Sequence, residues 1–209
     1  MSMFGLPSST EIRKPVHKKV LYAKFPTELS GERRKQFDED IGRIIITNEI
    51  SPVSVNIKEG EQVKSIFVLQ VELKKKDYNE RNIVLISKLF GQQLVIALKD
   101  ADEVQLATYQ TRLLCSKWLK SDEVGLRLSG LDLDAVWEHL VTQVSGIEVA
   151  DDNSLDEQIA IEQEKERLKK QIDDLEKKAR KETQSKRKFE MFQRIKAYEQ
   201  QLAEICKKN

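Results

Sequence analysis

The last 59 residues of this chain contain neither glycine nor proline. All eight glycines and all four prolines of the 209-residue sequence lie at or before Gly146. Residues 151–209 carry 15 Lys or Arg and 14 Asp or Glu, so 29 of these 59 positions are charged. A segment without helix breakers that is rich in Lys, Glu, Gln, Leu and Ala favours long helices. We therefore expect a globular domain over residues 1–150 and a charged helical tail over residues 151–209.

Apolar residues of the tail recur at spacings of three and four, as along the seam of a coiled coil. The pattern has two phases, and residues 181–190 between them have almost no apolar side chains. This break predicts two helices, over about 155–181 and 187–206, folded back as an antiparallel hairpin. A single long helix with a stutter is the alternative, and self-association through a coiled coil stays open. The seam residues that we expect to bind another helix or a partner are Leu168, Ile172, Leu175, Ile195, Leu202 and Ile205.

The first 150 residues predict a domain that mixes helices and strands. Residues 4–26 include three prolines and are expected to form an extended arm. Apolar residues at helical spacing predict an amphipathic helix within residues 28–50, which Ser51-Pro52 ends. Further along, we expect strands at 53–57, 63–75 and 92–100, one or two strands within 103–119, and helices at 80–90 and 131–144. This order favours an α+β or α/β fold, with a mixed central sheet flanked by helices.

Composition excludes several classes of protein. The net charge of +1 offers no global field for nucleic acid or for an acidic lipid surface. Two cysteines cannot form a disulfide framework or a four-ligand zinc site, and they fit a reducing compartment. No apolar run approaches the roughly 20 residues that span a bilayer, and the N-terminus lacks the core of a signal peptide. The sequence therefore predicts a cytoplasmic protein without a membrane partner.

The usual catalytic patterns are missing from the sequence. The glycines are scattered and form no phosphate-binding loop, and two histidines, His17 and His139, are too few and too far apart to suggest a metal site. Neither Cys115 nor Cys206 has a histidine nearby in sequence, so a thiol nucleophile would need a tertiary contact. We expect no catalytic residues, no metal site and no cofactor.

One pattern keeps an enzyme open as the alternative. Glu72 and Lys74 end a β-rich run, and alternation places them on the same face of the strand. Metal-dependent nucleases of the restriction-enzyme type use an acidic-x-Lys pair at a strand end, with another acid upstream, which Glu61 or Glu59 could supply. The carboxylates would hold Mg²⁺ and the lysine would orient the attacking water. Against this, no Pro-Asp pair precedes the motif, and Glu-x-Lys often arises by chance where 34% of residues are charged.

Basic clusters raise a third possibility, which is direct binding of nucleic acid. Arg33 and Arg34 in the body, and Lys186, Arg187 and Lys188 in the tail, could contact phosphates. Each cluster has acidic neighbours, and aromatic residues make up only 6% of the chain. Alternating charge on a helix usually marks a solvated face with ion pairs between successive turns. We therefore favour a solvated face over a DNA-binding groove.

Two stretches resemble a known family. They are LPSSTEIRKPVHKKVLYAKF (6–25) and LRLSGLDLDAVWEHLVTQVSG (126–146), which are similar to the opening and closing signatures of the bacterial domain-of-unknown-function family 4391. The apolar pattern between them and the charged tail fit as well. The resemblance implies no catalytic residues. It does imply a genomic context, because genes of this family tend to lie beside helicase and DNA methyltransferase genes in restriction and phage-defence loci.

These observations favour a non-catalytic accessory subunit over an enzyme. The body is expected to bind a large partner, which is a helicase-type motor, and a DNA methyltransferase is a further candidate partner. The tail is expected to dock a second copy or another subunit through its apolar seam, so contact with DNA would be indirect. The Mg²⁺-dependent nuclease and the DNA-binding module remain the alternatives.

Overall fold

The computed structural model describes residues 3–150 and 152–207, and the chain forms two compact units, residues 1–146 and 147–209. The division follows Gly146, which ends a helix in the left-handed conformation (φ 69°) that glycine adopts at little cost. Each unit has its own secondary structure. The first unit contains all the strands assigned to the described residues, and the second is helical.

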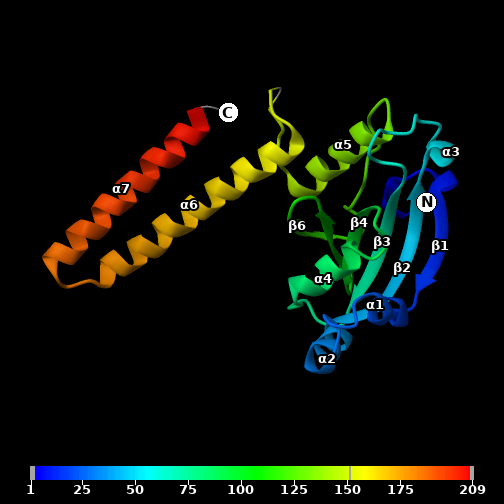
Figure 1. Ribbon diagram of the computed structural model, residues 1–209, viewed down its shortest axis with the longest axis horizontal. Coiled ribbons are helices and arrows are strands. Elements are labelled where there is room, and N and C mark those ends of the chain that lie inside the picture. Colours follow the sequence, from blue (N-terminus) through cyan, green and yellow to red (C-terminus); the bar gives the residue numbers. More distant parts are fainter. Residues whose placement is uncertain (1–2, 151, 208–209) are drawn as a thin grey trace. The chain divides into compact units, whose positions relative to one another are not determined.

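A six-stranded sheet, with its strands ordered as they occur in the chain, forms the first unit (Figure 1). Neighbouring strands run antiparallel except β3 and β4, which are parallel and are joined through helix α4. The strands are β1 (Glu11–Val16), β2 (Ile41–Ile50), β3 (Ile66–Leu73), β4 (Gln93–Asp100), β5 (Glu103–Tyr109) and β6 (Leu113–Lys120). The expected α+β class with a mixed central sheet flanked by helices is therefore confirmed.

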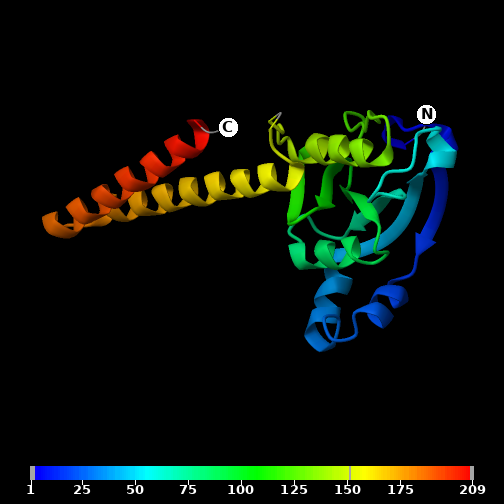
Figure 2. The same cartoon turned by 45° about the horizontal axis from the view of Figure 1, so that its top comes forward.

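Helices cover both faces of this sheet (Figure 2). On one face lie α1 (Lys18–Lys24), α2 (Gly31–Asp40) and α4 (Glu80–Ser87). Buried side chains of these helices and of strands β3 and β4 form the main core cluster, which includes Leu21, Phe37, Ile83, Ile86, Leu69, Val71, Ile96 and Leu98. On the other face lies α5 (Leu133–Ser145), which packs on β5 and β6. Alternation along β3 then turns Val68, Gln70 and Glu72 towards the face that carries α5.

The amphipathic helix expected within residues 28–50 is only half correct. Helix α2 ends at Asp40, and the chain continues directly into β2 from Ile41. The run Ile44-Ile45-Ile46-Thr47 is β-branched throughout, which favours a strand, and it pairs with both β1 and β3. The helical spacing of Phe37, Ile41 and Ile44 misled the prediction because it spans a junction between a helix and a strand.

Two further expectations about the first 60 residues are wrong. The expected arm contains β1, an edge strand on β2 that tolerates Pro15 at its exposed side, and also α1. Residues 53–57 do not form a strand, because Pro52–Val55 is the short helix α3. The Ser51 hydroxyl accepts a hydrogen bond from the Ser54 amide, and the Ser51 amide donates one to the Ser54 hydroxyl. Proline occupies the first helical position.

The remaining expectations agree with the structure. The helix at 80–90 is α4, the two long strands are β3 and β4, the region 103–119 forms two strands, and the helix at 131–144 is α5. None of the helices within residues 3–150 and 152–207 is long and apolar enough to cross a membrane.

The second unit is a helical hairpin. Helix α6 (Leu155–Lys181) and helix α7 (Ser185–Lys207) pack side by side and antiparallel, with a short turn between them (Figure 1). Ser154 caps α6 by accepting the Glu157 amide, and its own amide donates to the Glu157 carboxylate at 2.9 Å. The expected hairpin is confirmed, and the alternative of one continuous helix is wrong.

Candidate functional site

Two hollows open on the face of the sheet that carries α5. The larger has a volume of about 730 Å³ and lies over β3 and β4, beside the loop that follows β6. The smaller has a volume of about 400 Å³ and lies over β1 and β2. The first is lined by Phe4, Gly5, Gln70, Lys99, Val104 and residues 121–125, and the second by Arg13, Pro15, Arg43, Ile45, Thr47 and Gln70. Gln70 is common to both hollows.

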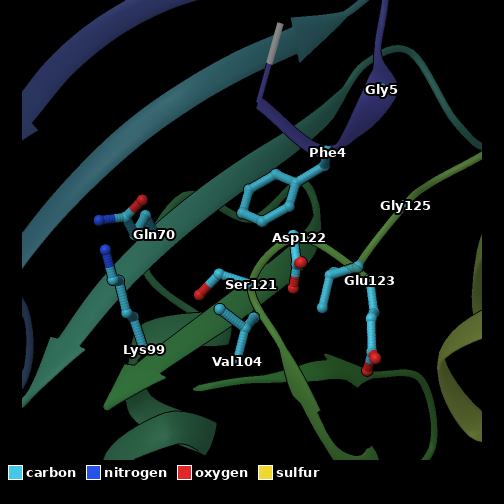
Figure 3. Close-up of a pocket in the computed structure, with 10 residues that line it drawn as sticks. Phe4, Gly5, Gln70, Lys99, Val104, Ser121, Asp122, Glu123 and Gly125 are labelled. Atoms are coloured by element: carbon cyan, nitrogen blue, oxygen red, sulfur yellow. The ribbon is translucent and has the colours of Figure 1, made fainter. Parts of the chain in front are cut away.

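Gln70 is the most unusual side chain of these hollows. It is only 9% exposed, although it lies at the rim of both hollows. Lys99 reaches towards it from the neighbouring strand β4, and the ring of Phe4 closes the opposite side (Figure 3). Asp122 and Glu123 also line this hollow, so its charge is mixed.

The structure separates the residues of the predicted nuclease site. Glu72 pairs with Lys99 in the sheet register, at the end of β3. Lys74 instead donates from Nζ to the Asp38 carbonyl at 2.7 Å. Glu61 lies beyond the other end of β3, which at about 3.3 Å per residue is roughly 25 Å away along the strand. Among the described residues, no three His, Cys, Asp or Glu side chains are grouped so that they could hold a metal ion.

A buried carboxylate at the end of α2 has a structural role. Asp40 is fully buried, and its Oδ2 accepts hydrogen bonds from the Asn79 amide and from Asn82 Nδ2, both at 2.9 Å. Its Oδ1 lies 2.9 Å from Lys75 Nζ, and the hydrogen bond to Asp40 raises the pKa of Lys75. Asp40 therefore holds the start of α4 in place, with both oxygens engaged.

The two cysteines lie in different surroundings, and the buried one is poorly suited to act as a nucleophile. Burial raises the pKa of Cys115 to about 11, so its thiol stays protonated at neutral pH. Cys206 lies exposed on α7. Both thiols are free.

The basic clusters predicted to contact nucleic acid lie in different units. Arg34 stacks its guanidinium on the Tyr22 ring, 4.0 Å from the ring centroid. Arg33 lines a hollow of about 330 Å³ between α2 and α4. Lys186, Arg187 and Lys188 open helix α7 of the second unit.

The hairpin brings the six predicted seam residues together within one chain. Leu168 of α6 is fully buried and Ile195 of α7 is 6% exposed. The other four remain half-buried along the same seam, and they are Ile172, Leu175, Leu202 and Ile205. The seam therefore serves first to join α6 to α7, and four of its members keep accessible surface.

Two aromatic residues of the hairpin had no place in the sequence prediction. Phe189 and Phe192 are 62% and 51% exposed near the start of α7. Neither is one of the six seam residues. Large apolar side chains that fall outside the seam of a charged helix are the sequence signal that could have identified them. Two large apolar side chains outside the seam have no partner helix in the hairpin.

A family model described as Domain of unknown function (DUF4391) matches residues 4–202. The chain belongs to this family. The match begins before β1 and ends within α7, so both the sheet and the hairpin are part of the DUF4391 domain. The resemblance noted from the two signature stretches is thus confirmed at the level of the family. No curated protein matches the chain, and no solved structure does.

Proposed function

We propose that this DUF4391 protein is a non-catalytic accessory subunit of a bacterial restriction-type or anti-phage defence complex, in which the hairpin docks a helicase-type partner. The observation that carries the proposal is the half-exposed seam of the hairpin. In a hairpin, each helix buries only a narrow apolar stripe against its single neighbour. An amphipathic helix packed in a larger bundle buries a wider apolar stripe. A partner helix that packs along the hairpin would cover the accessible sides of Ile172, Leu175, Leu202 and Ile205.

The rest of the hairpin supports this role. Its other faces are strongly charged, with ion pairs between successive turns such as Arg167–Glu164 and Lys177–Asp173. Such faces stay in water, so the seam is the natural place for a protein contact. The family match extends over both helices, which makes the hairpin a feature of the family rather than an addition in this chain.

The proposal is tested by removing the hairpin. The tagged protein would be expressed together with the products of its flanking genes, with nuclease treatment to exclude bridging by DNA. The full chain should recover a helicase subunit in a stable complex, and residues 1–146 alone should recover none. If the truncated protein recovers every partner of the full chain, the docking proposal is wrong.

A milder variant separates docking from folding. Leu202 and Ile205 lie near the end of α7 and are half-buried, so Leu202→Gln with Ile205→Gln should leave most of α6 and α7 helical. We expect this pair to weaken recovery of the partner at least about tenfold, because burying two unpaired polar side chains in an interface is unfavourable. Gln200→Ala with Gln201→Ala, at exposed neighbouring positions, is the matched control.

The nuclease alternative retains one observation. Glu72 is paired in the sheet register with Lys99, and Lys99 lines the larger hollow. In that case Glu72→Ala should abolish Mg²⁺-dependent cleavage of DNA by the assembled complex without dissociating it. Cleavage that survives in the Glu72→Ala complex would remove this alternative.

A further inference from the structure

Positive charge is concentrated at the turn of the hairpin, although the tail as a whole has nearly equal numbers of basic and acidic residues. We define the basic tip as residues 176–194, which include the end of α6 and the first turns of α7. The basic tip contains eight Lys or Arg and three Glu, a net charge of +5. The cations are Lys177, Lys178, Arg180, Lys181, Lys186, Arg187, Lys188 and Arg194.

The compensating acidic residues lie at the other end of the hairpin. Residues 147–166 contain eight Asp or Glu and a single lysine, Lys165. Helix α6 has 27 residues and is about 40 Å long, so the centres of the two charged regions lie several Debye lengths of roughly 8 Å apart. The acidic end therefore does not screen the basic tip.

Most of the cations at the start of α7 have no acidic partner. Lys177 and Arg180 pair with Asp173 and Glu176 on α6. By contrast, Lys186, Arg187, Lys188 and Arg194 form no ion pair with any residue that the structure describes. Lys186, Arg187 and Arg194 are exposed and Lys188 is half-buried, so these cations can reach a ligand.

Exposed aromatic rings lie among these unpaired cations. Phe189 and Phe192 are three positions apart, which places them on the same side of α7, about 4.5 Å apart along its axis. Their exposed fractions of 62% and 51% leave the rings accessible to a ligand. Flat apolar rings surrounded by unpaired cations form a surface that suits stacked bases linked by phosphates.

We propose that the basic tip binds single-stranded nucleic acid, with bases stacked on Phe189 and Phe192 and phosphates held by Lys186, Arg187, Lys188 and Arg194. A duplex hides the faces of its bases and would use only the cations. An acidic protein segment would likewise contact only the cations and would leave Phe189 and Phe192 without a stacking partner. Two phenylalanines bury too little apolar surface to hold a protein on a bilayer. This site is separate from the seam of the proposed docking function, so it is tested without any partner.

The first test is the affinity of the full chain for labelled oligonucleotides by fluorescence anisotropy. The probes are a dT strand of about 20 nucleotides, a duplex of the same length and a poly-glutamate peptide. We expect the single strand to bind at least about tenfold more tightly than the other two. Equal or tighter binding of the duplex or the peptide would overturn the proposal, as would binding to phosphatidylserine vesicles in preference to the strand.

Variants within the first turns of α7 separate stacking from charge. Phe189→Ala with Phe192→Ala should weaken binding of the strand by about tenfold or more, and Phe189→Trp should preserve it. Replacing Lys186, Arg187 and Lys188 by Glu should abolish binding at moderate salt. Replacing the same three residues by Gln should lower the slope of log affinity against log salt by about 2, at roughly 0.7 per phosphate contact.

The matched control is Lys169→Glu with Lys170→Glu, two exposed cations of α6 outside the basic tip. This pair should leave the affinity within about twofold of the unmodified chain, because neither cation belongs to the basic tip or neighbours the two rings in sequence. If the control weakens binding as much as the change at Lys186, Arg187 and Lys188, or if the alanine pair at Phe189 and Phe192 has no effect, the site is not the basic tip.

Discussion

Asp134 illustrates how much of the first unit depends on single polar side chains. It lies in the first turn of α5, and its carboxylate accepts hydrogen bonds from the amides of Glu61, Gln62 and Val63, at 2.7, 3.2 and 2.7 Å. A Cβ atom on Gly60 would come within 2.3 Å of this carboxylate, so the turn requires glycine there. Desolvation opposes the ionisation of Asp134, but the three amide hydrogen bonds outweigh it and lower its pKa.

This lowered pKa predicts how stability changes with pH. Because the folded carboxyl has a lower pKa than the unfolded one, its stabilising effect is complete above the unfolded value of about 3.9 and is lost as the pH falls through the folded value. Asp134→Asn should lower the free energy of unfolding by about 1–2 kcal/mol at pH 7, and by progressively less below about pH 4. Urea unfolding followed by circular dichroism across this range measures the effect.

The control for Asp134 is Glu138→Gln, at an exposed position on the same helix. It should change stability by less than about 0.5 kcal/mol. An Asp134→Asn variant that matches the unmodified chain at pH 7 would show that the three amides are satisfied without the charge.

The residue scale also explains why site prediction was incomplete. Sequence spacing correctly placed Glu72 at the end of β3. It could not show that Lys99 is the cross-strand partner of Glu72, or that Lys74 donates to the Asp38 carbonyl instead. Gln70 carried no signal, because a glutamine in a strand is expected to be solvated. Its burial depends on residues distant in sequence, because Lys99 and Phe4 lie beside it (Figure 3).

At the scale of elements, the hairpin depends on few fully buried contacts. Beyond the first turns of α6, the buried residues in the described part of the two helices are Leu168, Ala179 and Ile195. Helices of this kind owe their stability in water to packing of the apolar face rather than to propensity alone. The pairing of α6 with α7 should therefore be sensitive to a single polar substitution.

We expect Ile195→Asp to separate the two helices while the sheet stays folded. A charge without a partner in the seam costs several kcal/mol, and the helices then fray. Hydrogen exchange should lose protection in residues 155–207 and keep it in β3 and β4. Gln193→Asp, at an exposed position two residues earlier, should leave both regions protected. Loss of protection in the sheet as well would contradict the independence of the two units.

At the scale of the whole molecule, the chain is divided into two compact units at Gly146. The first unit has a continuous apolar core between its sheet and helices α1, α2 and α4. Its 146 residues are ample for a domain that folds by itself. The second unit is short and polar, and it contributes surface rather than a large core.

Residues 1–146 alone should therefore fold. We expect a cooperative thermal transition with a midpoint within about 5 °C of the main transition of the full chain, since the core residues are retained. Near-ultraviolet circular dichroism should keep the signals of Trp118 and Trp137. A truncated protein without a cooperative transition would show that the hairpin is required for the fold.

The sequence by itself determined the two-part organisation, the hairpin and most of the sheet. The absence of glycine and proline after Gly146, in a segment rich in Lys, Glu, Gln, Leu and Ala, favours helix, and the break in the seam indicated where the helix turns back. Prediction from the sequence failed where the spacing of apolar residues fits both a helix and a strand. The isoleucine run of β2 satisfies a helical period, and only the hydrogen bonds offered by β1 and β3 select the strand.

The tertiary structure alone decided how charge and aromatic surface are distributed. Counted along the chain, the tail is balanced and its aromatic residues are few. Folding back at residues 182–184 places the basic end of α6 beside the basic start of α7, and packing of Ile195 towards α6 leaves Phe189 and Phe192 in solvent. Charges act over about one Debye length, so their effect depends on spatial neighbours, which composition does not contain.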